Sequence, residues 1–262
     1  MAALPEHAKV VVIGQGGIVG ASVVHHLIEE GWDDIVGLEK SAIPTDIGST
    51  SHASDFCYMT SHDKLNVFTS NYSREFYKKR GNYIQIGGME VARKDDDERM
   101  LELIRKVGSG KAFGTNAYMI SAAEAKEKFP LLEEDQIQGA MWDPDAGLVT
   151  PRSQKVAGDL VDEAVASGKL KAFAYTPAHK ILVEDGVAVG VETPKGTIMA
   201  DYIVLCAGIW GSLISDTANV KLPLMPLEHP LLFFGPWEHL EGTGKDIVYP
   251  LMRDQGLSLI HI

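Results

Sequence analysis

The chain has 262 residues, of which 45% are hydrophobic and 23% are charged, and its formal net charge is −12. This composition is ordinary for a soluble globular protein with one large or two modest domains. The negative charge and the lack of a basic stripe argue against nucleic acid and anionic membrane surfaces as partners. The two cysteines, Cys57 and Cys206, have no metal-ligand spacing, so we expect a reduced compartment, no disulfide framework and no metal site.

The first elements of the chain follow the order strand, glycine turn, helix, strand. An apolar strand at residues 9–13 leads into the glycine-rich turn 14–20, a helix up to residue 30, and a second strand at 35–38. Such a unit binds a dinucleotide, because the glycines let the backbone approach the pyrophosphate at the positive end of the helix. Glu39 follows about 20 residues after the turn, where a carboxylate accepts hydrogen bonds from ribose hydroxyls. It would repel a ribose phosphate, so FAD or NAD fits better than NADP.

The spacing of the glycines departs from the usual G-x-G-x-x-G pattern. Val19 stands where the third glycine would follow Gly14 and Gly16, whereas Gly14, Gly17 and Gly20 recur at every third position. One extra residue in the turn accounts for this spacing and leaves the role of each glycine open. A structural turn without a ligand is the alternative interpretation.

The rest of the chain alternates between loops, helices and short strands. Small polar residues at 48–61 predict a loop that wraps a ligand, and residues 140–149 are predicted as a loop that crosses back towards the cofactor domain. Further helices are expected over residues 66–79, 95–107, 121–129 and 153–167, and strands over 83–92, 172–174, 180–184, 187–192, 197–200 and 202–206. The last strand meets a second glycine turn, Ala207-Gly208, where an open α/β sheet places its ligand.

Several blocks in this order resemble the D-amino-acid-oxidase-like flavoproteins, and more narrowly the dimethylglycine and sarcosine dehydrogenase/oxidase branch. They are the glycine turn, Leu38-Glu39-Lys40, residues 48–53, Gly87-Gly88-Met89-Glu90, Phe129-Pro130-Leu131-Leu132, residues 206–211 and residues 223–229. The resemblance implies an α/β fold with a discontinuous, Rossmann-like FAD-binding domain at residues 1–80 and 145–222. A mixed antiparallel-sheet substrate domain, partly missing, would occupy residues 81–144 and 223–262.

The resemblance also implies the site residues. Those expected to bind FAD are Gly14, Gly16, Gly17, Gly20, Glu39, Lys40, Ser49, Thr50, His52, Ala53, Ala178, Ala207, Gly208 and Trp210. His52 would hold FAD covalently through the 8α-methyl carbon, since a neutral imidazole is a good nucleophile near neutral pH. The alternatives are that His52 only hydrogen-bonds to a loop carbonyl and that Trp210 is a core residue.

His229 matches the family's active-site histidine, which implies that it positions the amine and keeps it unprotonated for hydride loss. The alternative is a loop residue before a proline. Pro230-Leu231 replaces the family's polar-aromatic pair, which leaves the substrate open. Arg253 could pair bidentately with a substrate carboxylate, with a surface salt bridge as the alternative.

The activity that the resemblance implies is FAD-dependent oxidation of a secondary or tertiary amino acid at a CH–NH donor, by hydride transfer to flavin. Oxygen or another electron acceptor would then reoxidise the flavin. Folate would be a partner only if a further C-terminal module exists. The family's tyrosine after residues 254–257 is missing and residues 258–262 look like adapter sequence, so we expect a truncated chain. The alternatives are a flavoprotein acting on another small amine, a hydroxy acid or glycerol phosphate, a non-catalytic FAD-binding fragment, and, less favoured, an NAD-dependent dehydrogenase.

Residues 1–7 resemble no targeting signal and no apolar run is long enough to span a membrane, so we expect a cytoplasmic protein.

Overall fold

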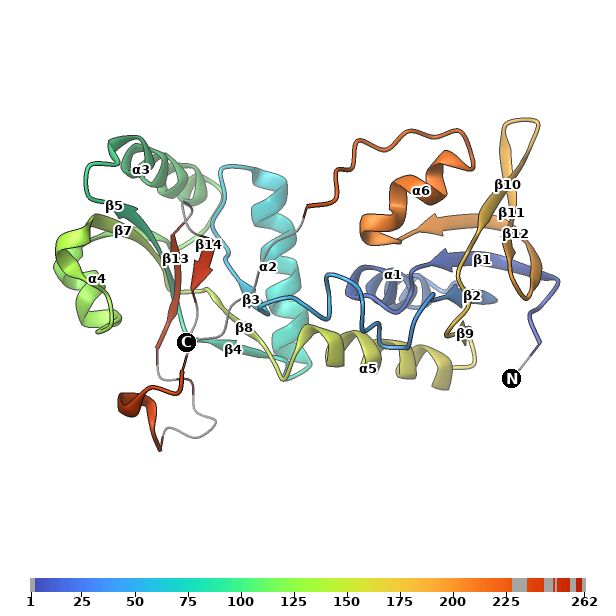
Figure 1. Cartoon of the computed structure of the whole chain (residues 1–262), viewed down its shortest axis with the longest axis horizontal. Helices are drawn as coiled ribbons and strands as arrows, with labels where there is room; N and C mark the ends of the chain where they lie inside the picture. Colours follow the sequence, from blue (N-terminus) through green and yellow to red (C-terminus); the bar gives the residue numbers. More distant parts are fainter. Residues whose placement is uncertain (1–2, 228–234, 243–246, 248, 255–257, 261–262) are drawn as a thin grey trace. The chain divides into compact units, whose positions relative to one another are not determined.

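The computed structural model describes residues 3–227, 235–242, 247, 249–254 and 258–260 (Figure 1). The chain divides into two compact units. Unit 1 comprises residues 1–54 and 151–231, and unit 2 comprises residues 55–150 and 232–262. Among the helices that are described, none combines the length and the apolar character needed to cross a membrane.

The borders of the units differ from the expected domain borders. Residues 55–80 and 145–150 belong to unit 2, and residues 223–231 belong to unit 1. The reason is pairing within unit 2: α2 (Lys64–Lys79) contacts β4 (Tyr83–Gln85), and the short strand at 147–149 pairs with β4.

Unit 1 is built on a sheet in which six strands are described. Their order across the sheet is β10 (Lys180–Glu184), β11 (Val187–Thr193), β12 (Gly196–Leu205), β1 (His7–Ile13), β2 (Ile35–Leu38) and β9 (Leu170–Phe173). Neighbours from β12 to β9 are parallel, whereas β10, β11 and β12 form an antiparallel meander. The predicted strands at 197–200 and 202–206 are therefore one strand, β12.

Helix α1 (Ile18–Glu29) connects β1 to β2 and packs against α5 (Ser153–Ala166) (Figure 1). The 3₁₀ helix η2 (Gly208–Trp210) and α6 (Gly211–Asp216) follow β12. In the parallel register Ile13 pairs with both Leu38 and Leu205. The carboxyl ends of β1, β2 and β12 therefore lie level with one another, at one edge of the sheet.

Unit 2 contains a mixed sheet in which five strands are described. Their order is β14 (Ser258–Ile260), β13 (Leu251–Asp254), β5 (Gly88–Arg93), β7 (Ile137–Asp143) and β6 (Tyr118–Ser121). Only β13 and β5 run parallel among these described neighbours. A smaller sheet joins β3 (Phe56–Cys57), β8 (Gly147–Val149) and β4, and the remaining elements are α3 (Asp97–Ala112), α4 (Ala122–Lys128), η1 (Glu134–Gln136) and η3 (Glu238–Leu240).

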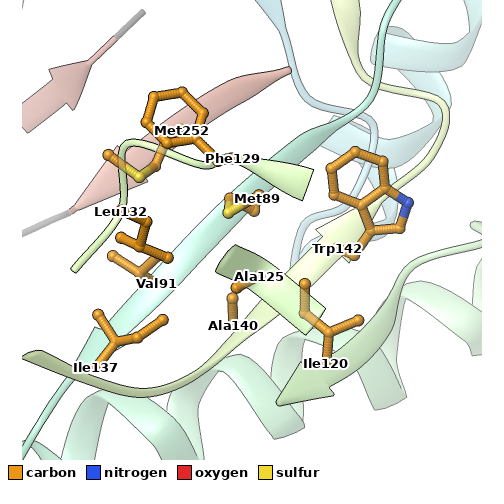
Figure 2. Close-up of a cluster of buried hydrophobic side chains, with 10 residues drawn as sticks. All are labelled: Met89, Val91, Ile120, Ala125, Phe129, Leu132, Ile137, Ala140, Trp142 and Met252. Carbon is orange, nitrogen blue, oxygen red and sulfur yellow. The ribbon is translucent and has the colours of Figure 1, made fainter. Parts of the chain in front are cut away.

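The core of the larger sheet in unit 2 gathers buried side chains from β5, β6, β7, β13 and α4 (Figure 2). Met89, Phe129 and Trp142 are among its members. Unit 1, with its parallel strands, and unit 2, with its mixed sheet, confirm the α/β fold class.

Two predicted elements in unit 2 were wrong. Residues 140–149 form the end of β7 and all of β8 rather than a loop, because β7 is hydrogen-bonded between β5 and β6 and is buried there. The predicted strand 83–92 is divided into β4 and β5, which lie in different sheets. The chain turns between them at Gly87, where φ is +75° and a Cβ would clash with the ring of Trp142.

Candidate functional site

A cavity of about 620 Å³ lies in unit 1 at the carboxyl ends of β1, β2 and β12. This is the place where an open α/β sheet binds its ligand, and the volume lies within the range of small-molecule sites. The expected residues that line it are Gly14, Gly17, Glu39, Lys40, Ser49, Thr50, Ala178, Ala207, Gly208 and Trp210. Gly16, Gly20, His52 and Ala53 lie outside this lining.

Gly14 and Gly20 allow the turn after β1 to pack closely. Gly14 has a φ of +85°, and a Cβ there would clash with the carbonyl oxygen of Cys206 at the end of β12. A Cβ at Gly20 would clash with the carbonyl oxygen of Gly14, so α1 could not approach the turn. These two glycines are required by the fold itself.

Gly17 lines the cavity, and Gly16 lies beside Glu39. Gly17 is the N-cap of α1 and lines the cavity, and a Cβ there would come no closer than 3.4 Å to another atom, Oγ1 of Thr50. No side chain of the cap residue satisfies the helix end, and Ile18 N donates to Oγ1 of Thr50 at 3.0 Å. A Cβ at Gly16 would lie 2.8 Å from Oε2 of Glu39, so Gly16 makes room for that carboxylate. The helix end at Gly17 is therefore open to an anionic group such as a pyrophosphate.

Glu39 is held in a fixed position by three donors. It is 5% exposed and lines the cavity. Its Oε2 accepts from Gly16 N at 3.2 Å, and its Oε1 accepts from N and Oγ of Ser41 at 3.1 and 3.2 Å. An ionised carboxylate has about four acceptor sites, so capacity remains for a ribose hydroxyl.

Lys40 and Trp210 meet at the cavity. The Nζ of Lys40 lies 3.8 Å from the centroid of the Trp210 ring, a cation–π contact. Both residues line the cavity, and Trp210 is not fully buried, so it is a wall of the cavity and not a core residue. Cys206 also lines it, and burial raises the pKa of this thiol, which is therefore protonated at neutral pH.

The loop 45–53 is anchored by side chains at the start of α5. Arg152 donates through Nη2 to the carbonyls of Ser51 and Ala53 at 3.3 and 3.1 Å, and Gln154 donates to the carbonyl of Thr45 at 2.8 Å. His52 lies on this loop with an exposed side chain. Its Nδ1 lies 2.9 Å from Oγ of Ser51 and 3.1 Å from the carbonyl oxygen of Gly48. The hydrogen bond to a loop carbonyl is thus present, and the covalent link stays a prediction.

Several residues of the cavity were not among the predicted site residues. They are apolar and mostly exposed, and they come from the start of α1, from η2 and α6, and from the extended segment 220–227: Val19, Ile209, Leu213, Leu222, Leu224 and Met225. The segment 220–227 has no periodicity, and only the family-like block at residues 223–229 could have marked it as part of a site. These residues give the cavity a largely apolar wall.

His229 lies outside the described residues. In unit 2, Arg253 is on β13, and its Nη1 lies 3.7 Å from Oε1 of Glu90, a carboxylate with no exposed surface. Arg253 therefore pairs with a buried group and not with a surface carboxylate.

The cavity in unit 1 fits a dinucleotide. It combines a fixed carboxylate for a ribose, an open helix end for a pyrophosphate and apolar walls for the rings.

Comparison with known proteins identifies the family. Residues 9–260 match the family described as FAD dependent oxidoreductase. The chain is 32% identical over 245 residues to the mitochondrial pyruvate dehydrogenase phosphatase regulatory subunit of Mus musculus, covering 90% of this chain and 27% of that protein. It is 30% identical to the mitochondrial sarcosine dehydrogenase of Homo sapiens, covering 98% of this chain and 28% of that protein.

A similar solved structure is the L-proline dehydrogenase from P. horikoshii, with a TM-score of 0.79 and 26% identity, covering 97% of this chain and 66% of that one. The chain spans less than a third of the length of the two curated relatives. With nearly all of its residues matched, the chain belongs to the family of FAD dependent oxidoreductases.

Proposed function

We propose that the protein oxidises a secondary or tertiary amino acid of the sarcosine or dimethylglycine kind, with FAD held in the cavity of unit 1. The observation that carries the proposal is this cavity, because it unites the Glu39 carboxylate with the open N-terminus of α1. Sarcosine and proline, which appear in the names of two relatives, are both secondary amino acids. The shared chemistry supports a CH–NH donor as substrate.

Different residues of the cavity would bind different parts of FAD. Glu39 would accept hydrogen bonds from the ribose, and the α1 N-terminus at Gly17 would bind the pyrophosphate. Lys40 and Trp210 would close one wall over the ligand. Bound FAD supplies a two-electron acceptor, and His229 would position the substrate amine and keep it unprotonated.

His52 is the residue that we propose as a covalent anchor for FAD. A proton on Nδ1 that is donated to the carbonyl of Gly48 leaves the lone pair of the neutral ring on Nε2. That tautomer presents Nε2 as the nucleophile. Arg152 fixes the two carbonyls beside His52, which limits the positions that the ring can take.

Acid precipitation of the purified protein tests this anchor. We expect yellow flavin to stay in the pellet of the wild type and to pass into the supernatant for His52→Gln. His7→Gln, a change of an exposed histidine of unit 1, should behave as the wild type. Flavin released from the wild type would contradict the covalent link, and protein without any flavin would contradict the binding of FAD.

Anaerobic titration with sarcosine, dimethylglycine and proline tests the reaction. We expect the visible absorbance of the flavin to bleach with at least one of them and to return when air or an artificial electron acceptor is added. A second candidate function is a flavin-binding regulatory module, because one relative is named a regulatory subunit. Flavin that is bound but bleached by none of these amines would favour the second candidate.

A further inference from the structure

The glycine turn after β1 is one residue longer than the usual pattern, and the cavity alone does not explain the extra length. The glycines in the usual three roles are Gly14 at the tight bend, Gly17 at the N-terminus of α1 and Gly20 where α1 meets the turn. Between Gly14 and Gly17 stand two residues, Gln15 and Gly16, where the G-x-G-x-x-G pattern has one. The extra length is therefore carried by Gln15 and Gly16.

The turn is joined to the end of β2 by three backbone donors. N of Gly16 donates to Oε2 of Glu39 at 3.2 Å. The backbone N of Gly14 and that of Gln15 donate to the carbonyl oxygen of Leu38, at 2.8 and 3.3 Å. The position of the Glu39 carboxylate therefore depends on the path that the turn takes.

The side chain of Gln15 takes the place of a side chain on β2. It is fully buried, and a Cβ at Gly37 would clash with Cγ of Gln15 and lie 2.8 Å from its Cδ. Val36 and Leu38, the neighbours of Gly37 in the strand, lie on the opposite face and belong to the core of unit 1. The turn therefore supplies the side chain that β2 lacks at Gly37.

Glu39 lies on the same face of β2 as Gly37, because side chains two residues apart in a strand share a face. The alternation still holds at Glu39, whose N donates to the carbonyl of Phe173, on β9, at 3.0 Å. Gln15 thus fills the space over Gly37, directly beside Glu39. With that space filled, the Glu39 side chain cannot fold back over Gly37, and it extends towards Gly16 and the cavity.

The Gln15 side chain contributes shape and not hydrogen bonds. Its Nε2 and Oε1 are buried and have no hydrogen-bond partner among the residues that the structure describes. Gln15 is not among the residues that line the cavity, so its amide does not contact a ligand there. Burial of an unpaired amide is unfavourable, and the packing over Gly37 is the favourable interaction that this side chain makes.

We propose that Gln15 and Gly37 are a matched pair, in which the Gln15 side chain fills the space over Gly37 and so positions Glu39 for the ribose of FAD. Gln15 is a positioning residue, since it does not touch the ligand. That Glu39 binds a ribose rests on the function proposed above, whereas the matching of Gln15 with Gly37 does not depend on any ligand. The extra residue in the turn and the missing side chain on β2 are thus one feature.

A double-mutant cycle tests the matching, in a His52→Gln background that has been freed of flavin. We expect Gly37→Ala to lower the melting temperature by about 5 °C or more, because the new methyl group overpacks the Gln15 side chain. Gln15→Ala should also lower it, by leaving a cavity. The double variant should be more stable than Gly37→Ala alone, because the methyl group then occupies the vacated space.

Gln138→Ala is the control for this cycle, since Gln138 lies in unit 2 and its side chain is bonded to the carbonyl of Arg93. Its effect should simply add to that of Gly37→Ala. Additive losses for Gln15→Ala and Gly37→Ala would overturn the matched pair.

Fluorescence titration with FAD, in the same background, tests the positioning of Glu39. We expect Gln15→Ala to weaken FAD binding at least about tenfold, the loss of one hydrogen bond to a charged group. FMN has no adenosine ribose, so it should bind Gln15→Ala and the parent equally. Gln15→Met keeps the shape and removes the amide, so it should bind FAD as the parent does and unfold at the same or a higher temperature.

The outcomes distinguish this proposal from the proposed function. A parent protein that binds no FAD overturns the proposed function, and non-additive stabilities would still support the matched pair. A parent that binds FAD no better than Gln15→Ala overturns the positioning of Glu39, and so does an equal loss of affinity for FAD and FMN. Weaker FAD binding by Gln15→Met would show that the amide itself contributes, which overturns a role through shape.

Discussion

At the scale of single residues, Gly14 and Gly17 differ in the space that surrounds them. A methyl group at Gly14 meets the carbonyl of Cys206 and must also adopt a φ of +85°. At Gly17 the same methyl group makes only ordinary contacts, but it enters the cavity wall at the end of α1. A substitution at Gly14 therefore tests the stability of the fold, whereas a substitution at Gly17 tests the binding of the ligand.

We expect Gly14→Ala to lower the free energy of unfolding by at least about 2 kcal/mol, because backbone strain and overpacking add. Gly17→Ala should change it by less than about 1 kcal/mol and should weaken FAD binding instead. Urea unfolding of both proteins, with flavin content measured after purification, checks the pair. Equal losses of stability in the two variants would contradict this division.

The sequence predicted those site residues whose signal is local. Glu39 stands out because it is an acid directly after an apolar strand, and the structure brings it to the cavity. The contact between Lys40 and Trp210 joins residues that lie far apart in the chain, so no local pattern could reveal it. Gln15 gave no signal either, although it is fully buried against Gly37 and its amide has no hydrogen-bond partner among the described residues.

At the scale of elements, α4 shows how a short helix is set by its own sequence. Ser121 and Glu124 form a capping box: Oγ of Ser121 accepts from Glu124 N, and Glu124 Oε2 accepts from Ser121 N at 2.7 Å. The hydrogen bonds from Ser121 hold the pKa of Glu124 below its usual value. The helix begins where the sequence predicted, because all of its determinants lie within four residues.

We expect Ser121→Ala to destabilise unit 2 by about 1 kcal/mol at neutral pH. A lowered pKa in the folded state means that Glu124 contributes stability above its unfolded pKa and loses it as the pH falls through the lowered value. The difference between wild type and Ser121→Ala should therefore shrink in acid. Chemical unfolding at neutral and at acid pH measures it, and Ser121→Thr, which keeps the hydroxyl, is the control.

Strands were harder to predict than helices because their partners are distant. The run 137–143 became β7 through hydrogen bonds to β5 and β6, which precede it in the chain and are not its neighbours in sequence. Of the predicted loop 140–149, only residues 144–146 connect two strands, β7 and β8. Partner strands, and not local propensity, decided the type of this element.

At the scale of the whole molecule, the division into two units makes a prediction about FAD. Binding should protect amides of unit 1 around the cavity from hydrogen exchange, at residues 14–20, 38–50 and 205–211, and should change unit 2 far less. For a non-covalent form such as His52→Gln, saturation at about 100 times Kd adds about 2.7 kcal/mol of stability. Hydrogen exchange with mass spectrometry, with and without added FAD, checks the pattern. Protection confined to unit 2 would contradict the site.

The pairing of β1 with β12 determines when the sheet of unit 1 can be completed during synthesis of the chain. Ile13 pairs with Leu205, so β1 leaves the ribosome long before the strand that covers its second edge. At about 5 to 20 residues per second, the wait is roughly 10 to 40 seconds. The β1–α1–β2 segment, with an uncovered apolar edge, is during that time a natural client for chaperones. The cavity for FAD is complete only after residue 206 has left the ribosome and the carbonyl of Cys206 has docked on Gly14.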